Sequence, residues 1–125
     1  GCYGTAISGA DGTAIGTGNQ NTIDIEAGCI TPGTAADICA NLTLGGYSDW
    51  FLPSKDELNQ MYLNIGQGSP SSLGNIGGFA SNYYWSSSEF GSSTTHAWDQ
   101  NFDTGSQQYY SKDYSGNGVR AVRAF

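Results

Sequence analysis

Apolar and polar residues alternate with a period of two along the last third of the chain, which predicts β-strands. Four such segments, separated by turn residues, are 83–88, 97–102, 107–112 and 119–125. Within the second segment, Trp98, Gln100 and Phe102 fall on one face of the strand, whereas Asp99 and Asn101 fall on the other. The pattern therefore predicts an antiparallel meander with one apolar and one polar face.

Two segments in the first half of the chain have helical periodicity instead. Thr34 can cap a helix over residues 33–42, where apolar residues recur on one face. Ser54 and Glu57 have the spacing of a capping box and open a second helix that we expect to end near Asn64. The Gly- and Thr-rich residues 1–28 predict two or three short strands. We therefore expect an α+β domain with a sheet drawn largely from its C-terminal half.

Length and composition indicate one folded, acidic domain. The 125 residues suit a single domain over 1–125, and 13% aromatic residues give it core-forming mass. Lys and Arg number 4 against 11 Asp and Glu, so we expect no nucleic-acid partner. No apolar run approaches the ~20 residues of a spanning helix, so we expect no direct membrane insertion. We interpret the chain as a domain excised from a larger protein.

Three cysteines, Cys2, Cys29 and Cys39, allow one disulfide and one leftover thiol. The spacing of Cys29 and Cys39 makes them the candidate pair, which is compatible with a secreted or surface protein. Buried free thiols in a reducing cytoplasm are the alternative. The chain has no CxxC motif and no Cys/His cluster, so we expect no metal and no cofactor.

Other chemical signals are weak. Asp99, Asn101, Asp103 and Gly105 imitate the start of a calcium loop, but the glycine falls one position late and Tyr110 stands where a closing glutamate belongs. This segment fits a strand and turn better than a calcium site.

Catalytic constellations are equally weak. His96 is the only histidine, and its Ser/Thr-rich surroundings are typical of a solvated loop. Glu89 and Asp99 support a glycosidase pair by residue type alone. We therefore expect no enzymatic activity.

Residues 90–118 are the most informative stretch. Framework-like positions alternate there with Gly, Ser, Thr, Asn, Asp, His and Tyr, the residue types of antibody contact surfaces. Hairpin turns use the same small polar residues, which is the alternative explanation. Tyr109, Tyr110 and Tyr114 favour a contact surface, since turns do not require three tyrosines.

Three ordered motifs resemble one family, the domains named for the C-terminal domain of the Legionella collagen-like adhesin. They are GGYSDWFLPSKDEL at 45–58, YWSSSE at 84–89 and VRAVR at 119–123. The resemblance implies a C-type lectin-like fold, in which two helices flank a twisted antiparallel sheet and the loop-rich C-terminal half forms the binding face. The calcium-dependent sugar-binding signatures Glu-Pro-Asn and Gln-Pro-Asp are absent from the sequence.

A narrower resemblance is to the variable proteins of diversity-generating retroelements, whose C-terminal segment is rewritten at adenines. It implies that residue types reachable from Asn codons form the ligand-contacting set. The candidate positions are Ser92, Ser93, Thr94, His96, Asp99, Asn101, Ser106, Tyr109, Tyr110, Ser111, Asp113, Tyr114, Ser115 and Asn117.

Together these features predict a non-enzymatic recognition domain on a cell surface or virion, at the end of a larger protein. Its partner is expected to be a macromolecule, either a protein or a surface glycan. A structural or oligomerising adhesin module with a fixed partner is the alternative. The oligomeric state is left open by the sequence.

Overall fold

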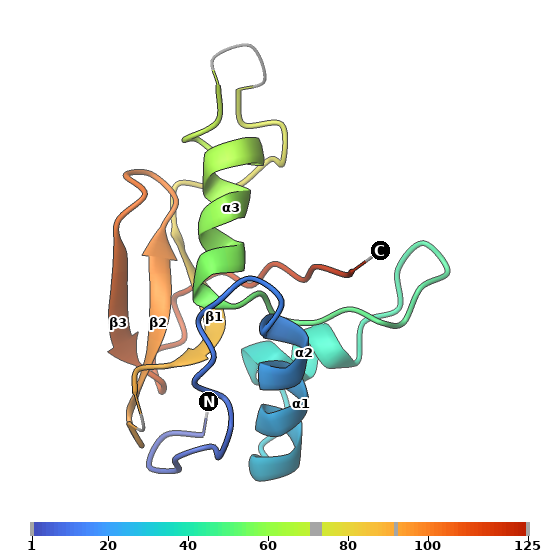
Figure 1. The fold of residues 1–125 in the computed structure, drawn as a ribbon, viewed down its shortest axis with the longest axis vertical. Coiled ribbons are helices and arrows are strands. Elements are labelled where there is room, and N and C mark those ends of the chain that lie inside the picture. The colour runs from blue at the N-terminus through green and yellow to red at the C-terminus, as the bar shows by residue number, and fades with distance from the viewer. Residues whose placement is uncertain (1, 71–73, 92, 125) are drawn as a thin grey trace.

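Helices precede strands along the chain. The computed structural model describes residues 2–70, 74–91 and 93–124. In the described part the elements are α1 (Gly18–Gly28), α2 (Ala35–Ala40), α3 (Lys55–Ile65), β1 (Tyr83–Glu89), β2 (His96–Asn101) and β3 (Gln107–Ser111). Figure 1 shows α3 beside the sheet, with α1 and α2 together at one end of the molecule. The chain is thus an α+β domain, and its sheet comes from the C-terminal half as expected.

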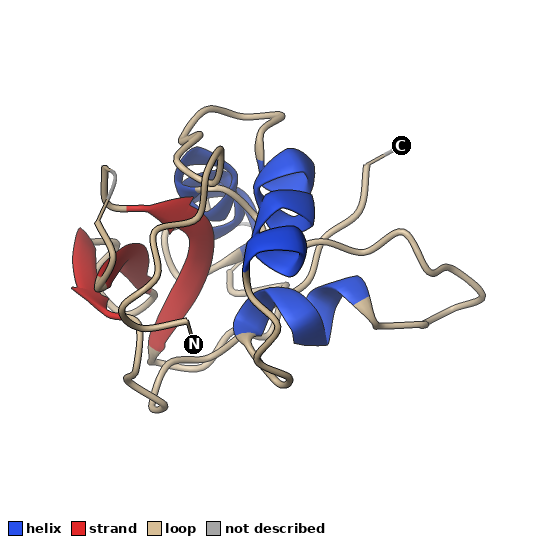
Figure 2. Cartoon of the chain, turned by 90° about the horizontal axis from the view of Figure 1, so that it is seen from below, coloured by secondary structure: helices blue, strands red, loops and turns tan. Residues whose placement is uncertain are grey.

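The three strands form one antiparallel sheet in the order β1-β2-β3. Directly opposed residues share a face, so Tyr109 lies on the face of Trp98, and Gln108 on the face of Asp99. The face that carries Trp98 and Gln100 packs on α3, where the Gln100 amide donates to the side chain of Asn59 over 2.8 Å. In Figure 2 the strands lie at one side of the molecule, with α3 next to them and α1 and α2 farther away.

The two helices expected from the sequence are present. Thr34 caps α2 by accepting from the Asp37 amide, and Ser54 and Glu57 form the predicted capping box at α3. Glu57 has a second partner, because its Oε1 also accepts from the Gly18 amide at the start of α1. One carboxylate therefore fixes the first turns of two helices.

Helix α1 contradicts the expectation of short strands in residues 1–28. The side chain of Thr17 makes no cap, and α1 has no apolar stripe: Asn21 and Thr22 are buried while Ile23 is exposed. Its N-terminus is held by Glu57, which is 39 residues away in sequence from Gly18. The sequence of residues 18–28 therefore has neither a capping residue nor an apolar periodicity from which this helix could be predicted.

Aromatic rings form the core between α3 and the sheet. Phe102 is fully buried and lies 4.6 Å from Phe79 and 4.8 Å from Tyr84, measured between ring centroids, with Leu58 of α3 beside them. Buried serines of β1 fasten other segments to the sheet, since Ser88 donates to the Gly12 carbonyl over 2.7 Å. Polar as well as apolar contacts therefore hold the elements on β1.

The expected last strand, 119–125, is wrong for the residues that the structure describes. Residues 119–124 run alongside Phe51 with one isolated bridge, formed by Phe51 and Val122 through two backbone hydrogen bonds. Position 125 lies outside the described residues. The segment alternates in sequence like a strand, but it has one short pairing instead of a ladder.

The disulfide joins Cys2 and Cys29, whose Cα atoms are 5.9 Å apart. The expected pairing of Cys29 with Cys39 is wrong. Helix α2 turns Cys39 into the core against Ala36 and Leu52, where burial raises the pKa of its thiol to about 12. Cys29 instead follows the end of α1 and meets the N-terminal segment, which folds back over it.

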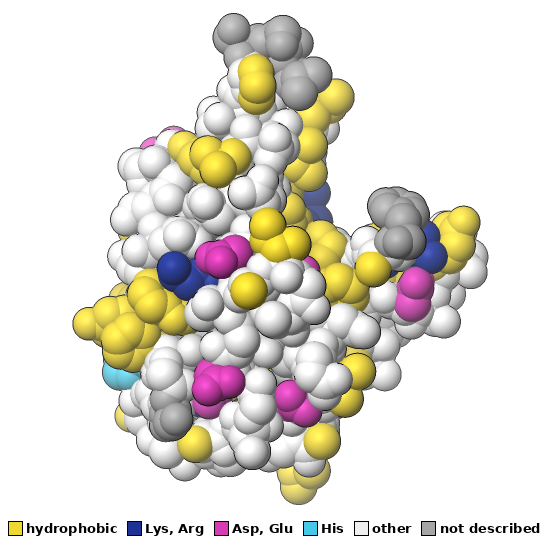
Figure 3. All heavy atoms as spheres, in the orientation of Figure 1, with side chains coloured by type: hydrophobic (Ala, Val, Ile, Leu, Met, Phe, Trp, Pro, Cys, Tyr) yellow, Lys and Arg dark blue, Asp and Glu magenta, His cyan; other side chains and the backbone are white. Residues whose placement is uncertain are grey.

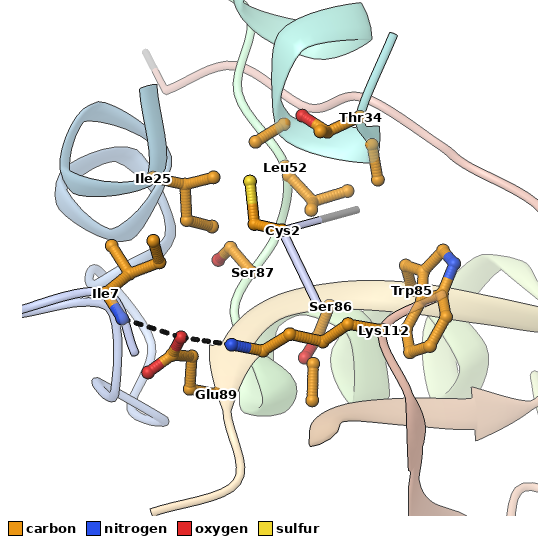
Figure 4. Close-up of a pocket in the computed structure, with 13 residues that line it drawn as sticks. Cys2, Ile7, Ile25, Thr34, Leu52, Trp85, Ser86, Ser87, Glu89 and Lys112 are labelled. Carbon is orange, nitrogen blue, oxygen red and sulfur yellow. Dashed lines mark hydrogen bonds and ion pairs between the residues drawn. The ribbon is translucent and has the colours of Figure 1, made fainter. Parts of the chain in front are cut away.

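A buried ion pair links β1 to the residue after β3. Lys112 Nζ lies 2.5 Å from Glu89 Oε1, and the two side chains are 6% and 4% exposed. The ammonium also donates to the carbonyls of Thr5 and Ser93, and the Ile7 amide donates to Glu89 Oε1. Figure 4 shows the pair beside a cavity of about 60 Å³, large enough for water and too small for most ligands.

Candidate functional site

Most of the predicted contact residues reach the surface. Thr94, Ser106, Tyr109, Tyr110, Asp113, Tyr114 and Ser115 are exposed. Partly buried are Ser93, His96, Asn101, Ser111 and Asn117, whereas Asp99 is buried. Ser92 lies outside the described residues. The sheet divides these residues between its two faces, so they do not form one continuous patch.

The first group is the aromatic cluster, which we define as Phe90, His96, Trp98 and Tyr109. The Phe90 and Tyr109 rings stack at 3.9 Å between centroids, and Trp98 and His96 meet the Tyr109 ring edge-on. Lys55, the first residue of α3, lies with its Nζ 4.5 Å from the centroid of Trp98. Figure 3 shows hydrophobic side chains gathered at this edge of the molecule, with the histidine in cyan next to them.

The second group lies on the opposite face and surrounds the tyrosine groove. This groove of about 290 Å³ runs between residues 31–38 and residues 112–119. Tyr114 lines it, and Tyr110 meets the Tyr114 ring edge-on at 4.9 Å between centroids. Asp113, Ser115 and Asn117 line the same side. Four predicted residues therefore border one surface depression.

Asp99 lies behind this groove. Asn117 donates to Asp99 Oδ2 over 2.8 Å, while Asp99 Oδ1 finds no hydrogen-bond partner among the described residues. Burial raises the pKa of Asp99 from 3.8 to about 6, against the lowering effect of hydrogen bonds from Asn117 and Gln108. The expectation of an exposed polar face at Asp99 is wrong, because residues 113–118 cover that part of the sheet.

Asp99 predicts a pH-dependent contribution to stability. Since the folded state holds this proton more tightly than the unfolded chain, the ionised carboxylate destabilises the fold. The penalty is absent below about pH 4 and reaches up to about 3 kcal/mol above about pH 6. Asp99→Asn is expected to remove this decline, as measured by urea unfolding across that range. Parallel pH profiles for the two proteins would contradict the assignment.

Asn101 and Ser106 lie at the far end of the β2–β3 hairpin from the tyrosine groove. Asn101 Oδ1 accepts from the amides of Asp103 and Thr104, which forms the turn, and Gly105 has the positive φ of 82° that the turn requires. The calcium-like spacing of this segment is therefore accounted for by the hairpin.

Ser93 lies in the loop between β1 and β2, whereas His96 is the first residue of β2 and is partly buried, so the expected solvated loop at His96 is wrong. Ser93 Oγ accepts from the amides of Thr95 and His96, and the Ser93 carbonyl accepts from Lys112. Thr95 Oγ1 lies 2.7 Å from His96 Nδ1. These contacts give the loop a defined shape, on which exposed Thr94 is presented.

Glu89 and Asp99 do not share a cleft. Glu89 is ion-paired with Lys112 and lines the small cavity beside that pair, which Asp99 does not line. Among residues 2–70, 74–91 and 93–124, no three His, Cys, Asp or Glu side chains gather as metal ligands. Within the same ranges, no helix is both long and apolar enough to cross a bilayer.

Several residues at these sites were not among the predicted contacts. Trp98 was assigned to the framework, Lys55 to a helix start, and Phe90 was named only as the first residue of the informative stretch. Strand alternation placed Trp98 on the face of Phe102, but Trp98 is not part of the aromatic core, and Lys55 of α3 lies over its ring. The position of Gln108 could have been predicted from the sequence, because it lies two residues before Tyr110 and therefore shares its face of β3.

The fold and these surfaces define an α+β domain with exposed aromatic side chains along the outer strand of its sheet. The chain belongs to the Lcl C-terminal domain family, whose sequence profile matches residues 12–123. Membership of this family identifies a ligand-binding or recognition domain. Searches of curated proteins and of solved structures found no match to the chain.

Proposed function

We propose that this chain is a non-enzymatic recognition domain whose C-terminal face is diversified to bind a protein or a surface glycan. The observation that carries the proposal is the contrast within residues 90–114. Phe90, Tyr109, Tyr110 and Tyr114 are 37–50% exposed, whereas the intervening Phe102 is fully buried. Tyrosine offers a large amphipathic contact area with little loss of side-chain entropy. The exposed aromatics are therefore suited to contact a partner, while the fold rests on other residues.

Two further features support this proposal. The Cys2–Cys29 disulfide suits an oxidising setting, in agreement with a cell-surface or virion location as part of a larger protein. Helices that precede an antiparallel hairpin region suit a C-type lectin-like scaffold. Such a scaffold would tolerate sequence change on its loops and on β3, because the aromatic core is formed by Leu58, Phe79, Tyr84 and Phe102.

Binding tests separate recognition from folding. We expect the variant Y109A/Y110A/Y114A to lose at least about tenfold in affinity for ligands found on glycan and protein arrays. Its free energy of unfolding should fall by less than about 2 kcal/mol, because these side chains are half exposed. Tyr3→Ala, at a tyrosine that is 55% exposed on the N-terminal segment, is the matched control. Full binding by the triple variant would contradict the proposal.

A second candidate function is an oligomerising module with a fixed partner. It is favoured by apolar side chains exposed on the helices and the loop after them, since Ile23, Ile38 and Leu44 are 51–58% exposed. Sedimentation of the isolated domain discriminates between the two, because a monomer at all concentrations counts against the second.

A further inference from the structure

The tyrosine groove combines an apolar floor with an acidic rim. Trp85, Ala35 and Val119 contribute apolar surface, and Asp113 lies at the exposed side. Its volume of about 290 Å³ is just below the ~300–1,000 Å³ of small-molecule pockets, which suits one side chain of a partner.

The charges around the groove favour a cation on balance, because the lysine that lines it is paired with a carboxylate. Lys112, which also lines it, has its ammonium paired with Glu89 in the interior. Asp113 is the other charged lining residue in the described part of the chain, and buried Asp99 lies behind Asn117. Asp37 adds a third carboxylate close by, since it accepts from the amide of Gly33 in the groove wall. A domain of net charge −7 also attracts basic partners over distance.

Aromatic rings stand at the same place as the carboxylate. Tyr114 lines the groove and is 46% exposed, and Tyr110 supports it from β3. A guanidinium is planar and weakly hydrated, so it stacks on aromatic faces and pairs with carboxylates better than an ammonium does. The three-carbon stem of an arginine side chain can lie on the apolar floor of the groove.

We propose that the tyrosine groove binds an arginine side chain presented by a partner protein. The stem lies on Trp85 and Val119, and the guanidinium lies against the Tyr114 ring and the Asp113 carboxylate. This proposal rests on the proposed recognition function and narrows its ligand from any macromolecule to a protein with an exposed arginine.

A peptide probe tests the proposal without knowledge of the natural partner. The ¹⁵N-labelled domain is titrated with acetyl-Gly-Arg-Gly-amide and, in parallel, with the same peptide carrying neutral citrulline, at about 0.02 M salt. We expect amide shifts confined to residues 31–38 and 112–119. The citrulline peptide should bind about two- to fivefold more weakly than the arginine peptide, because it lacks one exposed ion pair. Salt at about 0.3 M should reduce this difference in affinity.

Two variants locate the charge. Asp113→Asn should bring the arginine peptide to the affinity of the citrulline peptide, whereas Asp11→Asn, the same change at an exposed aspartate outside the groove, should leave it unchanged. Equal binding of both peptides, shifts elsewhere or no shifts would overturn the proposal. A neutral glycoside that shifts the same amides when arginine does not would also overturn it, while the tyrosine variants above test recognition separately.

Discussion

Replacing Lys112 by methionine is expected to lower the free energy of unfolding by about 3–5 kcal/mol. The substitution leaves the Glu89 carboxylate buried without its counter-ion, and it removes the donor to the carbonyls of Thr5 and Ser93. Burying an unpaired charge costs far more than losing an exposed ion pair. Urea unfolding of the variant measures the loss.

Two controls make the Lys112 result specific. Lys55→Met removes the other lysine, whose ammonium lies over Trp98, and should cost less than about 1 kcal/mol. Adding Glu89→Gln to Lys112→Met should recover part of the loss, because no uncompensated charge is then buried. Losses that simply add in the double variant would show that the two side chains are not coupled.

Removing the disulfide is expected to have the second large effect. Cys2 and Cys29 are separated by 27 residues, and closing a loop of this length restricts the unfolded chain by about 3–4 kcal/mol. The double variant C2A/C29A should therefore unfold at lower urea concentration by that amount. A reductant should destabilise the wild-type domain similarly and leave the double variant unchanged.

Peptide mapping tests the pairing itself. Alkylation of the unfolded, unreduced domain should label Cys39 alone, and digestion should yield a fragment joining Cys2 to Cys29. A fragment joining Cys29 to Cys39 would contradict the structure and restore the pairing that sequence spacing suggested.

Local patterns were sufficient for most of the secondary structure. The capping box at Ser54 and the alternation through Trp98 and Phe102 gave α3 and β2 close to their observed bounds. Helix α1 was not predicted from the sequence. Its N-terminus is held by Glu57 of α3, far away in the chain, and its buried residues include the polar Asn21. Long-range hydrogen bonds of this kind leave no periodic trace in the sequence.

The candidate contact residues were chosen from the sequence by residue type, and their contribution to binding stays a prediction. The exposure of Tyr109, Tyr110 and Tyr114 agrees with the contact-surface interpretation. The division of Tyr109 and Tyr110 between two sheet faces follows from the period-two alternation of the predicted strand, whereas the contact of Tyr110 with Tyr114, which lies beyond β3, was not determined by any residue pattern. The burial of Asp99 depends on residues 113–118 folding back over the sheet, a tertiary event that strand alternation does not encode.

Sequencing the gene region for residues 90–118 across a population of the source organism tests the central claim most directly. We predict differences concentrated at exposed positions such as Tyr109, Tyr110 and Tyr114, with buried Phe102 and Lys112 unchanged. That result would establish a diversified recognition face on a fixed scaffold. A uniform sequence, or differences spread evenly over buried and exposed positions, would contradict it.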